Sequence, residues 1–102
     1  MKIAVSGATG RMGKLIIETV LNSDNLELVA AVTAPGVAEI GTDAGASLGK
    51  TTGILISANV EELAQADVLI DFTRPQATLA YLPFCVKHNV GVVIGTTGFD
   101  AQ

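Results

Sequence analysis

A strand-like segment, a glycine-rich turn and a helix-like segment follow one another without a gap at the beginning of the chain. Ile3-Ala4-Val5-Ser6 is an apolar run typical of a short buried strand. Glycines then recur at every third position in Gly7-Ala8-Thr9-Gly10-Arg11-Met12-Gly13, and apolar residues continue at helical spacing as far as Leu21. Such a turn joins the first strand and first helix of a β-α-β unit. The chain is therefore restricted to α/β folds.

Three further apolar segments predict strands, at residues 26–32, 67–72 and 91–94. They are nearly free of polar alternation, which is typical of parallel strands covered on both faces. Helices are expected at about residues 59–66, with Asn59 as N-cap, and 75–88. Adding a strand between the long loop and residue 59 gives the order β-α-β, loop, β-α-β-α-β, which predicts a Rossmann-like doubly wound parallel sheet in a single three-layer α/β domain.

Three local features carry expectations of their own. In the first helix, apolar positions 12, 15, 16 and 20 predict the buried face, with Lys14 and Glu18 as an i,i+4 pair opposite. Pro83 falls inside the last predicted helix, where we expect a kink or a local restart because proline removes a hydrogen bond. Residues 34–53 carry five of the eleven glycines and no clear periodicity, which predicts a functional or mobile loop.

Length and composition exclude several classes of protein. The 102 residues amount to one domain, and a net charge of −4 argues against binding to nucleic acid or an anionic membrane surface. No apolar run approaches the ~20 residues of a membrane span. One cysteine excludes an internal disulfide and a multi-cysteine metal site. The first residues lack signal-peptide anatomy, so we expect a cytoplasmic protein. Residues 98–102 resemble a turn and N-cap without its helix, so we expect a domain, 1–102, truncated at its C-terminus.

The glycine turn predicts a dinucleotide site. Glycines there permit a tight turn and let backbone N–H groups approach a pyrophosphate, while the helix N-terminus offers unpaired donors and partial positive charge. Arg11 adds a possible charge-assisted contact. We therefore assign cofactor binding to Gly7, Ala8, Thr9, Gly10, Arg11 and Met12. The alternative is a plain turn with no ligand.

The end of the second strand is the usual place for the residue that distinguishes NAD from NADP. An acidic residue there binds the ribose 2′-hydroxyl, and a basic one accepts a 2′-phosphate. Thr33-Ala34-Pro35 stands in that place, so neither charge is present and the choice between NADH and NADPH stays open. Thr33 is a candidate for contact with either group, or is a strand-end threonine without a ligand.

Polar segments also follow two later strands. Ligands of open α/β sheets bind outside the carboxyl ends of the strands, so both segments are candidate ligand contacts. Thr73 and Arg74 stand at a helix start, where they contact a cofactor or anion, or serve as an N-cap and a surface arginine. Gly95-Thr96-Thr97-Gly98 offers bare backbone and two hydroxyls for close ligand approach, or is a simple turn.

The remaining candidate residues do not indicate a catalytic or binding function. The segment from Gly45 to Thr51 resembles a nucleotide-triphosphate phosphate loop, but its first glycine is one position too close and no convincing strand precedes it. We interpret His88 as a solvated helix end and Cys85 as core packing. Glu39 and Asp43 lie in the long loop without evident partners. We find no catalytic triad and no metal-ligand cluster, so no metal is expected.

Four segments together resemble the N-terminal domain of the 4-hydroxy-tetrahydrodipicolinate reductase (dihydrodipicolinate reductase) family of bacterial lysine and diaminopimelate synthesis. They cover essentially the whole chain. The two strand-end motifs, further along the chain, are far more specific to the family than the glycine turn. The segments are Gly7-Ala8-Thr9-Gly10-Arg11-Met12-Gly13, Gly41-Thr42-Asp43-Ala44-Gly45, Asp71-Phe72-Thr73-Arg74-Pro75 and Val93-Ile94-Gly95-Thr96-Thr97-Gly98-Phe99.

The resemblance implies an oxidoreductase in which NADPH or NADH gives a hydride to a small cyclic dicarboxylate. On this basis Gly7 to Met12 bind the pyrophosphate, and Phe72, Thr73 and Arg74 line the cofactor cleft. Gly95, Thr96 and Thr97 contact the nicotinamide side, and Thr97 also faces the substrate. On this resemblance we expect the family's second domain, which supplies the proton donor, a lysine, the anion-binding groups and a tetramer interface, to be missing from this chain. No catalytic residue is therefore expected here, only cofactor binding without turnover, with a homotetramer expected of the full-length protein.

Two departures and two alternatives accompany this hypothesis. The family often carries an acidic and then a basic residue where Thr33 and Ala34 stand, and its helix is not expected to contain a proline such as Pro83. One alternative is a self-sufficient, non-enzymatic dinucleotide-binding module that senses redox state. A short-chain dehydrogenase would need Tyr-x-x-x-Lys, but Tyr81 is followed four residues later by Cys85, so we set it aside.

Overall fold

The structure, a computed structural model, describes residues 1–71 and 75–94. Within these residues, five strands form one sheet: β1 (Lys2–Ser6), β2 (Glu27–Val32), β3 (Ile56–Ser57), β4 (Val68–Asp71) and β5 (Gly91–Ile94). They are connected by α-helices α1 (Arg11–Leu21) and α2 (Pro75–Lys87) and by 3₁₀ helices η1 (Ala46–Leu48) and η2 (Val60–Gln65).

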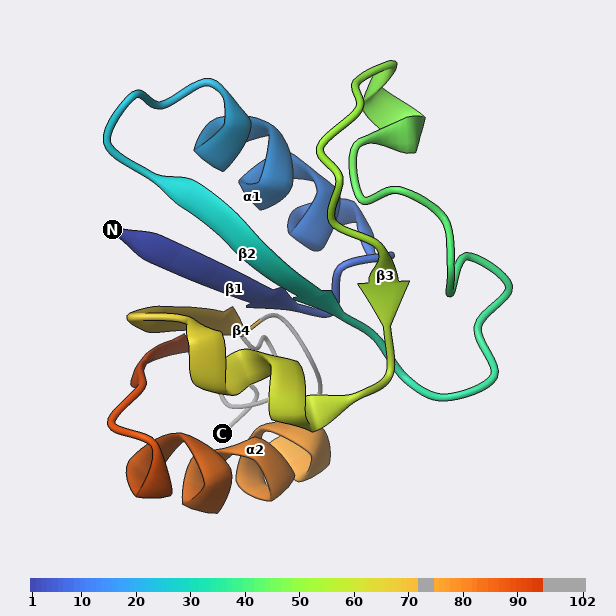
Figure 1. The fold of residues 1–102 in the computed structure, drawn as a ribbon. Coiled ribbons are helices and arrows are strands. Elements are labelled where there is room, and N and C mark those ends of the chain that lie inside the picture. Colours follow the sequence, from blue (N-terminus) through green and yellow to red (C-terminus); the bar gives the residue numbers. More distant parts are fainter. Residues whose placement is uncertain (72–74, 95–102) are drawn as a thin grey trace.

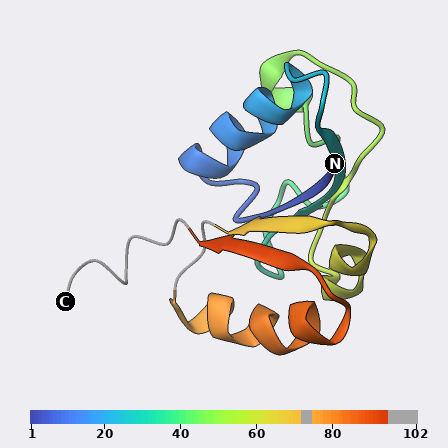
Figure 2. The ribbon, with the colours of Figure 1, turned by 90° about the vertical axis from the view of Figure 1, so that its left-hand side faces the viewer.

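The sheet is parallel throughout, in the order β3-β2-β1-β4-β5. The chain builds outward from β1 to β3 and then returns to the other side of β1, so the order reverses between β1 and β4. Helices α1 and η1 cover one face of the sheet, and η2 and α2 cover the other (Figures 1 and 2). The predicted doubly wound, three-layer α/β fold is thus confirmed.

Each face of the sheet has its own apolar core. Successive side chains of a strand point to opposite faces, so Ile3 and Val5 of β1 face α1 while Ala4 faces α2. Cys85 is fully buried in the second core, as its interpretation as core packing requires. The α1 core consists of Ile3, Val5, Ala8, Ile17, Val20, Leu28, Ala31, Ala44 and Ile56. The α2 core consists of Ala4, Ala30, Val32, Leu63, Ala66, Leu69, Cys85 and Val90.

The buried face of α1 agrees only in part with the predicted one: Val20 is buried and Ile16 packs against the core, as predicted. Its buried residues are Gly13, Ile17 and Val20, whereas Met12 and Leu15 are 46% and 49% exposed. The apolar pattern is misleading because the residue of α1 that lies closest to the strand end is a glycine, which carries no hydrophobic signal.

Helix α2 runs through Pro83 without restarting, so that part of the expectation was wrong. Pro83 is exposed, so its ring lies on the solvent side of the helix. The helix ends where Asn89 adopts a left-handed conformation with φ of 59°. The N–H groups of Asn89 and Val90 then donate to the carbonyls of Val86 (3.3 Å) and Cys85 (2.8 Å), the pattern of a Schellman cap.

Asn59 caps η2, as predicted. Its side-chain oxygen accepts a hydrogen bond of 3.0 Å from the backbone N–H of Glu61. The helix that follows is 3₁₀ rather than α-helical.

The glycine-rich segment 34–53 is tied to the sheet by backbone hydrogen bonds. Gly41 donates to the Ile56 carbonyl, Ile56 donates to Thr42, and Ala44 donates to Ile54, each at 2.8 Å. An antiparallel bridge also joins Asp43 to Leu55. The segment thus doubles back along β3 and lies beside the N-terminal end of α1 (Figure 1).

Candidate functional site

The glycine turn places the start of α1 directly against the end of β1. Gly7 has φ of 73°, a left-handed conformation that glycine adopts at little cost. A Cβ on Gly13 would overlap the carbonyl oxygen of Gly7 and lie 2.8 Å from its carbonyl carbon. Gly13 therefore permits the close helix–strand contact, whereas a Cβ on Gly10 would meet only the Gly7 oxygen, at 3.4 Å. Gly10 leaves open space beside the turn.

The N-terminal end of α1 presents unused hydrogen-bond donors. Within the turn, the Ala8 N–H donates to the Val32 carbonyl at 3.1 Å and the Gly10 N–H to the Gly7 carbonyl at 3.0 Å. The N–H groups of Arg11 and Met12 have no acceptor among the described residues. Both residues are exposed, and two N–H groups at a helix N-terminus suit an anion such as a phosphate.

Thr33 connects the end of β2 to the glycine turn. Its hydroxyl lies 2.9 Å from that of Thr9, and its N–H donates to the Ser57 carbonyl at 2.8 Å. Thr33 is only 4% exposed. Two of the predicted cofactor contacts, Thr9 and Thr33, are thus brought together, but the Thr33 hydroxyl already has a partner within the chain.

A buried carboxylate lies at the point where the strand order reverses. Ser6 at the end of β1 pairs in register with Asp71 at the end of β4, and the Ser6 hydroxyl donates to Asp71 Oδ1 at 2.6 Å. Both side chains are fully buried. Burial, and secondarily the charge of Asp71, raises the pKa of Tyr81 and of Cys85 on α2, so both stay neutral near pH 7. The sequence pattern did not single out this Ser6–Asp71 contact, because the two residues are adjacent only in the folded sheet.

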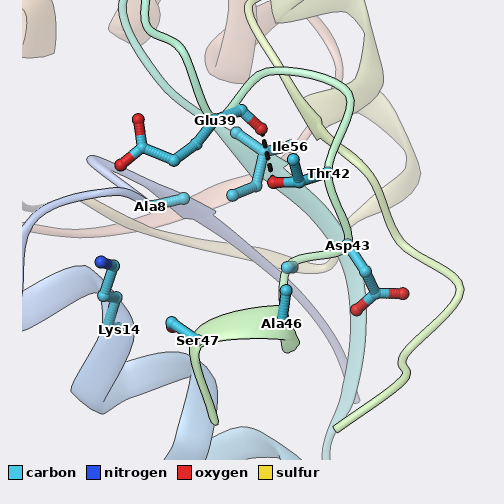
Figure 3. Close-up of a pocket in the computed structure, with 9 residues that line it drawn as sticks. Ala8, Lys14, Glu39, Thr42, Asp43, Ala46, Ser47 and Ile56 are labelled. Carbon is cyan, nitrogen blue, oxygen red and sulfur yellow. Dashed lines mark hydrogen bonds between the residues drawn. The ribbon is translucent and has the colours of Figure 1, made fainter. Parts of the chain in front are cut away.

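A pocket of about 360 Å³ opens between the glycine turn and segment 34–53 (Figure 3). Ala8 and Lys14 line it from the turn and α1, and Glu39 lines it from the loop (Figure 3). Lys14 and Glu18 form no ion pair within the described part of the chain, so their predicted pairing was wrong: Lys14 faces the pocket instead. The other lining residues are Thr42, Asp43, Ala44, Ala46, Ser47 and Ile56.

The carboxylate of Asp43 is bound by the loop itself, contrary to the expectation that it lacks partners. It accepts hydrogen bonds from the N–H groups of Gly45 (2.8 Å), Thr52 (3.0 Å) and Gly53 (2.9 Å) and from the Thr52 hydroxyl (2.8 Å). These bonds, those of the Gly45 and Thr52 N–H groups first, lower the pKa of Asp43 from 3.8 to about 2. The side chain of Lys50, in the segment that resembles a phosphate loop, donates to Asn22 at 2.8 Å. Gly45, the first residue of that segment, donates to Asp43, which agrees with the rejection of a triphosphate-binding loop from the sequence.

Other sequence predictions fall partly outside the described residues. Phe72, Thr73, Arg74, Gly95, Thr96 and Thr97 all lie there. His88 is exposed and contacts the ring of Phe84, with centroids 4.4 Å apart. Among residues 1–71 and 75–94, no helix is long and apolar enough to cross a membrane. The same residues hold no group of three or more His, Cys, Asp or Glu side chains placed to bind a metal.

Comparison with known protein families decides which α/β proteins this chain is related to. The model for "Dihydrodipicolinate reductase, N-terminus" matches residues 1–102. The chain belongs to this family. The prediction drawn from its four motifs is therefore confirmed.

Curated relatives agree with this assignment. The chain is 52% identical over 101 residues to the 4-hydroxy-tetrahydrodipicolinate reductase of Bordetella pertussis, matching 99% of the chain. It is 56% identical over 102 residues to the enzyme of that name from Cupriavidus metallidurans, again matching 99% of the chain. It spans 38% of the length of each of these relatives.

Solved structures show the same fold. A dipicolinate-bound dihydrodipicolinate reductase from Paenisporosarcina sp. TG-14 matches 96% of this chain and 38% of its own, with a TM-score of 0.73 and 29% identity. Aspartate semialdehyde dehydrogenase II from Vibrio cholerae matches 96% of this chain and 31% of its own, with a TM-score of 0.68. At 21% identity, the second match indicates a shared fold only.

Proposed function

We propose that residues 1–102 are the dinucleotide-binding domain of a 4-hydroxy-tetrahydrodipicolinate reductase. The observation that carries the proposal is the pair of free N–H groups, those of Arg11 and Met12, at the N-terminus of α1. They stand beside the strand-order reversal, where open α/β sheets bind their ligands. Membership in the reductase family supports a nicotinamide dinucleotide as the ligand class.

The turn fits a pyrophosphate. Gly10 leaves room on its outer side, because a Cβ there would contact only the Gly7 carbonyl oxygen. A phosphate in that room accepts from the helix N-terminus, and the exposed Arg11 guanidinium adds charge. We assign the cofactor contacts to Gly7, Ala8, Thr9, Gly10, Arg11, Met12 and Thr33 and, on the nicotinamide side, to Phe72, Thr73, Arg74, Gly95, Thr96 and Thr97.

We propose the rest of the activity from the family relationship. The bound nicotinamide supplies a hydride to a small cyclic dicarboxylate in lysine and diaminopimelate synthesis. Thr97 faces that substrate, and the remaining catalytic groups lie outside this chain. The chain by itself binds cofactor without turnover, and the intact protein works in the cytoplasm as a homotetramer.

Calorimetric titration with NADPH and with NADH tests the proposal. We expect saturable one-to-one binding of at least one dinucleotide to the folded chain, and weaker binding by Gly10→Ala because the added methyl group enters the phosphate position. Glu18→Gln, an exposed change on α1, is the matched control and should bind as the parent does. Absence of binding by a chain that circular dichroism finds folded would contradict the assignment of the turn.

The second part of the test is turnover. A protein that joins this chain to the remaining family domain should oxidise the dinucleotide only when the cyclic dicarboxylate is present. A protein that binds dinucleotide but never oxidises it with this substrate contradicts the reductase proposal and leaves the dinucleotide site standing.

A further inference from the structure

The position that usually binds the 2′ group of the adenosine ribose carries no charge in this chain. Thr33 and Ala34 follow β2, where an acidic residue selects the 2′-hydroxyl and a basic residue selects the 2′-phosphate. The Thr33 hydroxyl is also buried against that of Thr9. Any discrimination between NADH and NADPH therefore has to come from other side chains.

Two such side chains face one pocket beside the glycine turn. Lys14 extends from the N-terminal part of α1 and Glu39 from the opposite loop, with Ala8 of the turn between them (Figure 3). Both are half-buried, and no ion pair joins them to each other or to another described residue. The pocket thus holds an ammonium group and a carboxylate that are separate and free to bind a ligand.

Glu39 is held in place by a short turn. The Thr42 hydroxyl donates to the Glu39 carbonyl at 2.6 Å, and the Thr42 N–H donates to the same oxygen at 3.0 Å (Figure 3). That turn is attached to β3 through Gly41 and Ile56. Asp43, the other carboxylate that lines the pocket, is bound by loop N–H groups, so its charge is already compensated.

We propose that Lys14 and Glu39 read the 2′ position of the adenosine ribose. Lys14 binds the 2′-phosphate of NADPH, and Glu39 accepts a hydrogen bond from the 2′-hydroxyl of NADH. In other dinucleotide sites, charged residues after β2 distinguish the 2′-hydroxyl from the 2′-phosphate. Here we assign that role to Lys14 on α1 and Glu39 in segment 34–53. This inference rests on the proposed dinucleotide function and assigns its specificity to residues that the glycine motif does not include.

The test is a crossed change in cofactor preference. In Lys14→Met we expect the dissociation constant for NADPH to rise about tenfold and that for NADH to change less than about twofold, because only NADPH loses a charge-assisted contact. In Glu39→Gln we expect NADH to bind more weakly, while NADPH binds as before or more tightly because a negative charge near its phosphate is gone. The two variants thus move the preference in opposite directions.

Lys87→Met and Glu18→Gln are matched controls, since both residues are exposed and lie outside the pocket. Thermal unfolding checks that each variant folds, and Lys14→Gln replaces Lys14→Met if the latter does not. Equal weakening of both dinucleotides, or no change in either, overturns the reading of the 2′ position while the dinucleotide site stands. If the parent chain binds neither dinucleotide, the proposed function fails together with this inference.

Discussion

At the scale of single residues, the glycine turn combines two different requirements. Gly13 is needed by the fold, because any side chain there would overlap the Gly7 carbonyl. Gly10 is not needed by the described fold, since a methyl group would make only an ordinary contact. The sequence spacing cannot separate these two roles, because both positions are simply glycine.

Gly13→Ala should therefore destabilise the protein strongly. We expect a loss of about 3 kcal/mol in the free energy of unfolding, the upper range for overpacking, because backbone must move to admit the methyl group. Chemical denaturation measures the change, and Gly10→Ala should stay within about 1 kcal/mol of the parent. Similar stabilities of the two variants would contradict the separation of roles.

The Ser6–Asp71 hydrogen bond predicts a second residue-scale effect. Ser6→Ala removes one donor to a buried carboxylate, and we expect a loss of about 2 kcal/mol because hydrogen bonds to charged groups contribute more than neutral ones. Denaturant unfolding at neutral pH measures it. A Ser6→Ala protein as stable as the parent shows that this contact does not hold β1 and β4 together.

At the scale of elements, the regular segments were predictable and their packing was less so. Strand β5 and the Asn59 cap occur where the sequence pattern placed them, since apolar runs and cap residues are local signals. The buried face of α1 was predicted only in part, because Gly13 approaches the strand without an apolar side chain. The pocket that Lys14 and Glu39 share was also not predicted from the sequence, because it depends on how segment 34–53 folds back toward α1.

The loop around Asp43 should make stability depend on pH. The pKa of Asp43 falls from 3.8 to about 2 on folding, so its carboxylate stabilises the folded state above pH 3.8. That contribution is lost as the pH falls from 3.8 through about 2, where the folded protein also takes up the proton. Asp43→Asn lacks it, so the two proteins should differ in unfolding free energy at pH 6 and converge near pH 2. A difference that is independent of pH contradicts this role.

Pro83 lies inside α2, where we expect it to lower the stability of the helix. An interior proline costs a helix about 3 kcal/mol, and Pro83 is exposed, so its ring is not required for core packing. We expect Pro83→Ala to raise the melting temperature by several degrees. A lower melting temperature in calorimetry indicates instead that the helix has a geometry that only proline maintains.

At the scale of the whole molecule, the sheet order brings the separate signals together. β1 and β4 meet at the strand-order reversal, with the glycine turn at one strand end and Asp71 at the other. The charged pocket continues from that turn toward β3. The family model matches residues 1–102, and the chain spans 38% of the length of the Bordetella pertussis relative.

The most direct test of this account maps the dinucleotide onto the folded chain. Backbone amide resonances are recorded by NMR while NADPH is added. We predict that the largest shifts occur at Arg11 and Met12, whose N–H groups are free, and extend to Lys14 and Glu39. Shifts confined to the opposite face, at η2 and the C-terminal end of α2, or no shifts at saturating NADPH, would contradict the account.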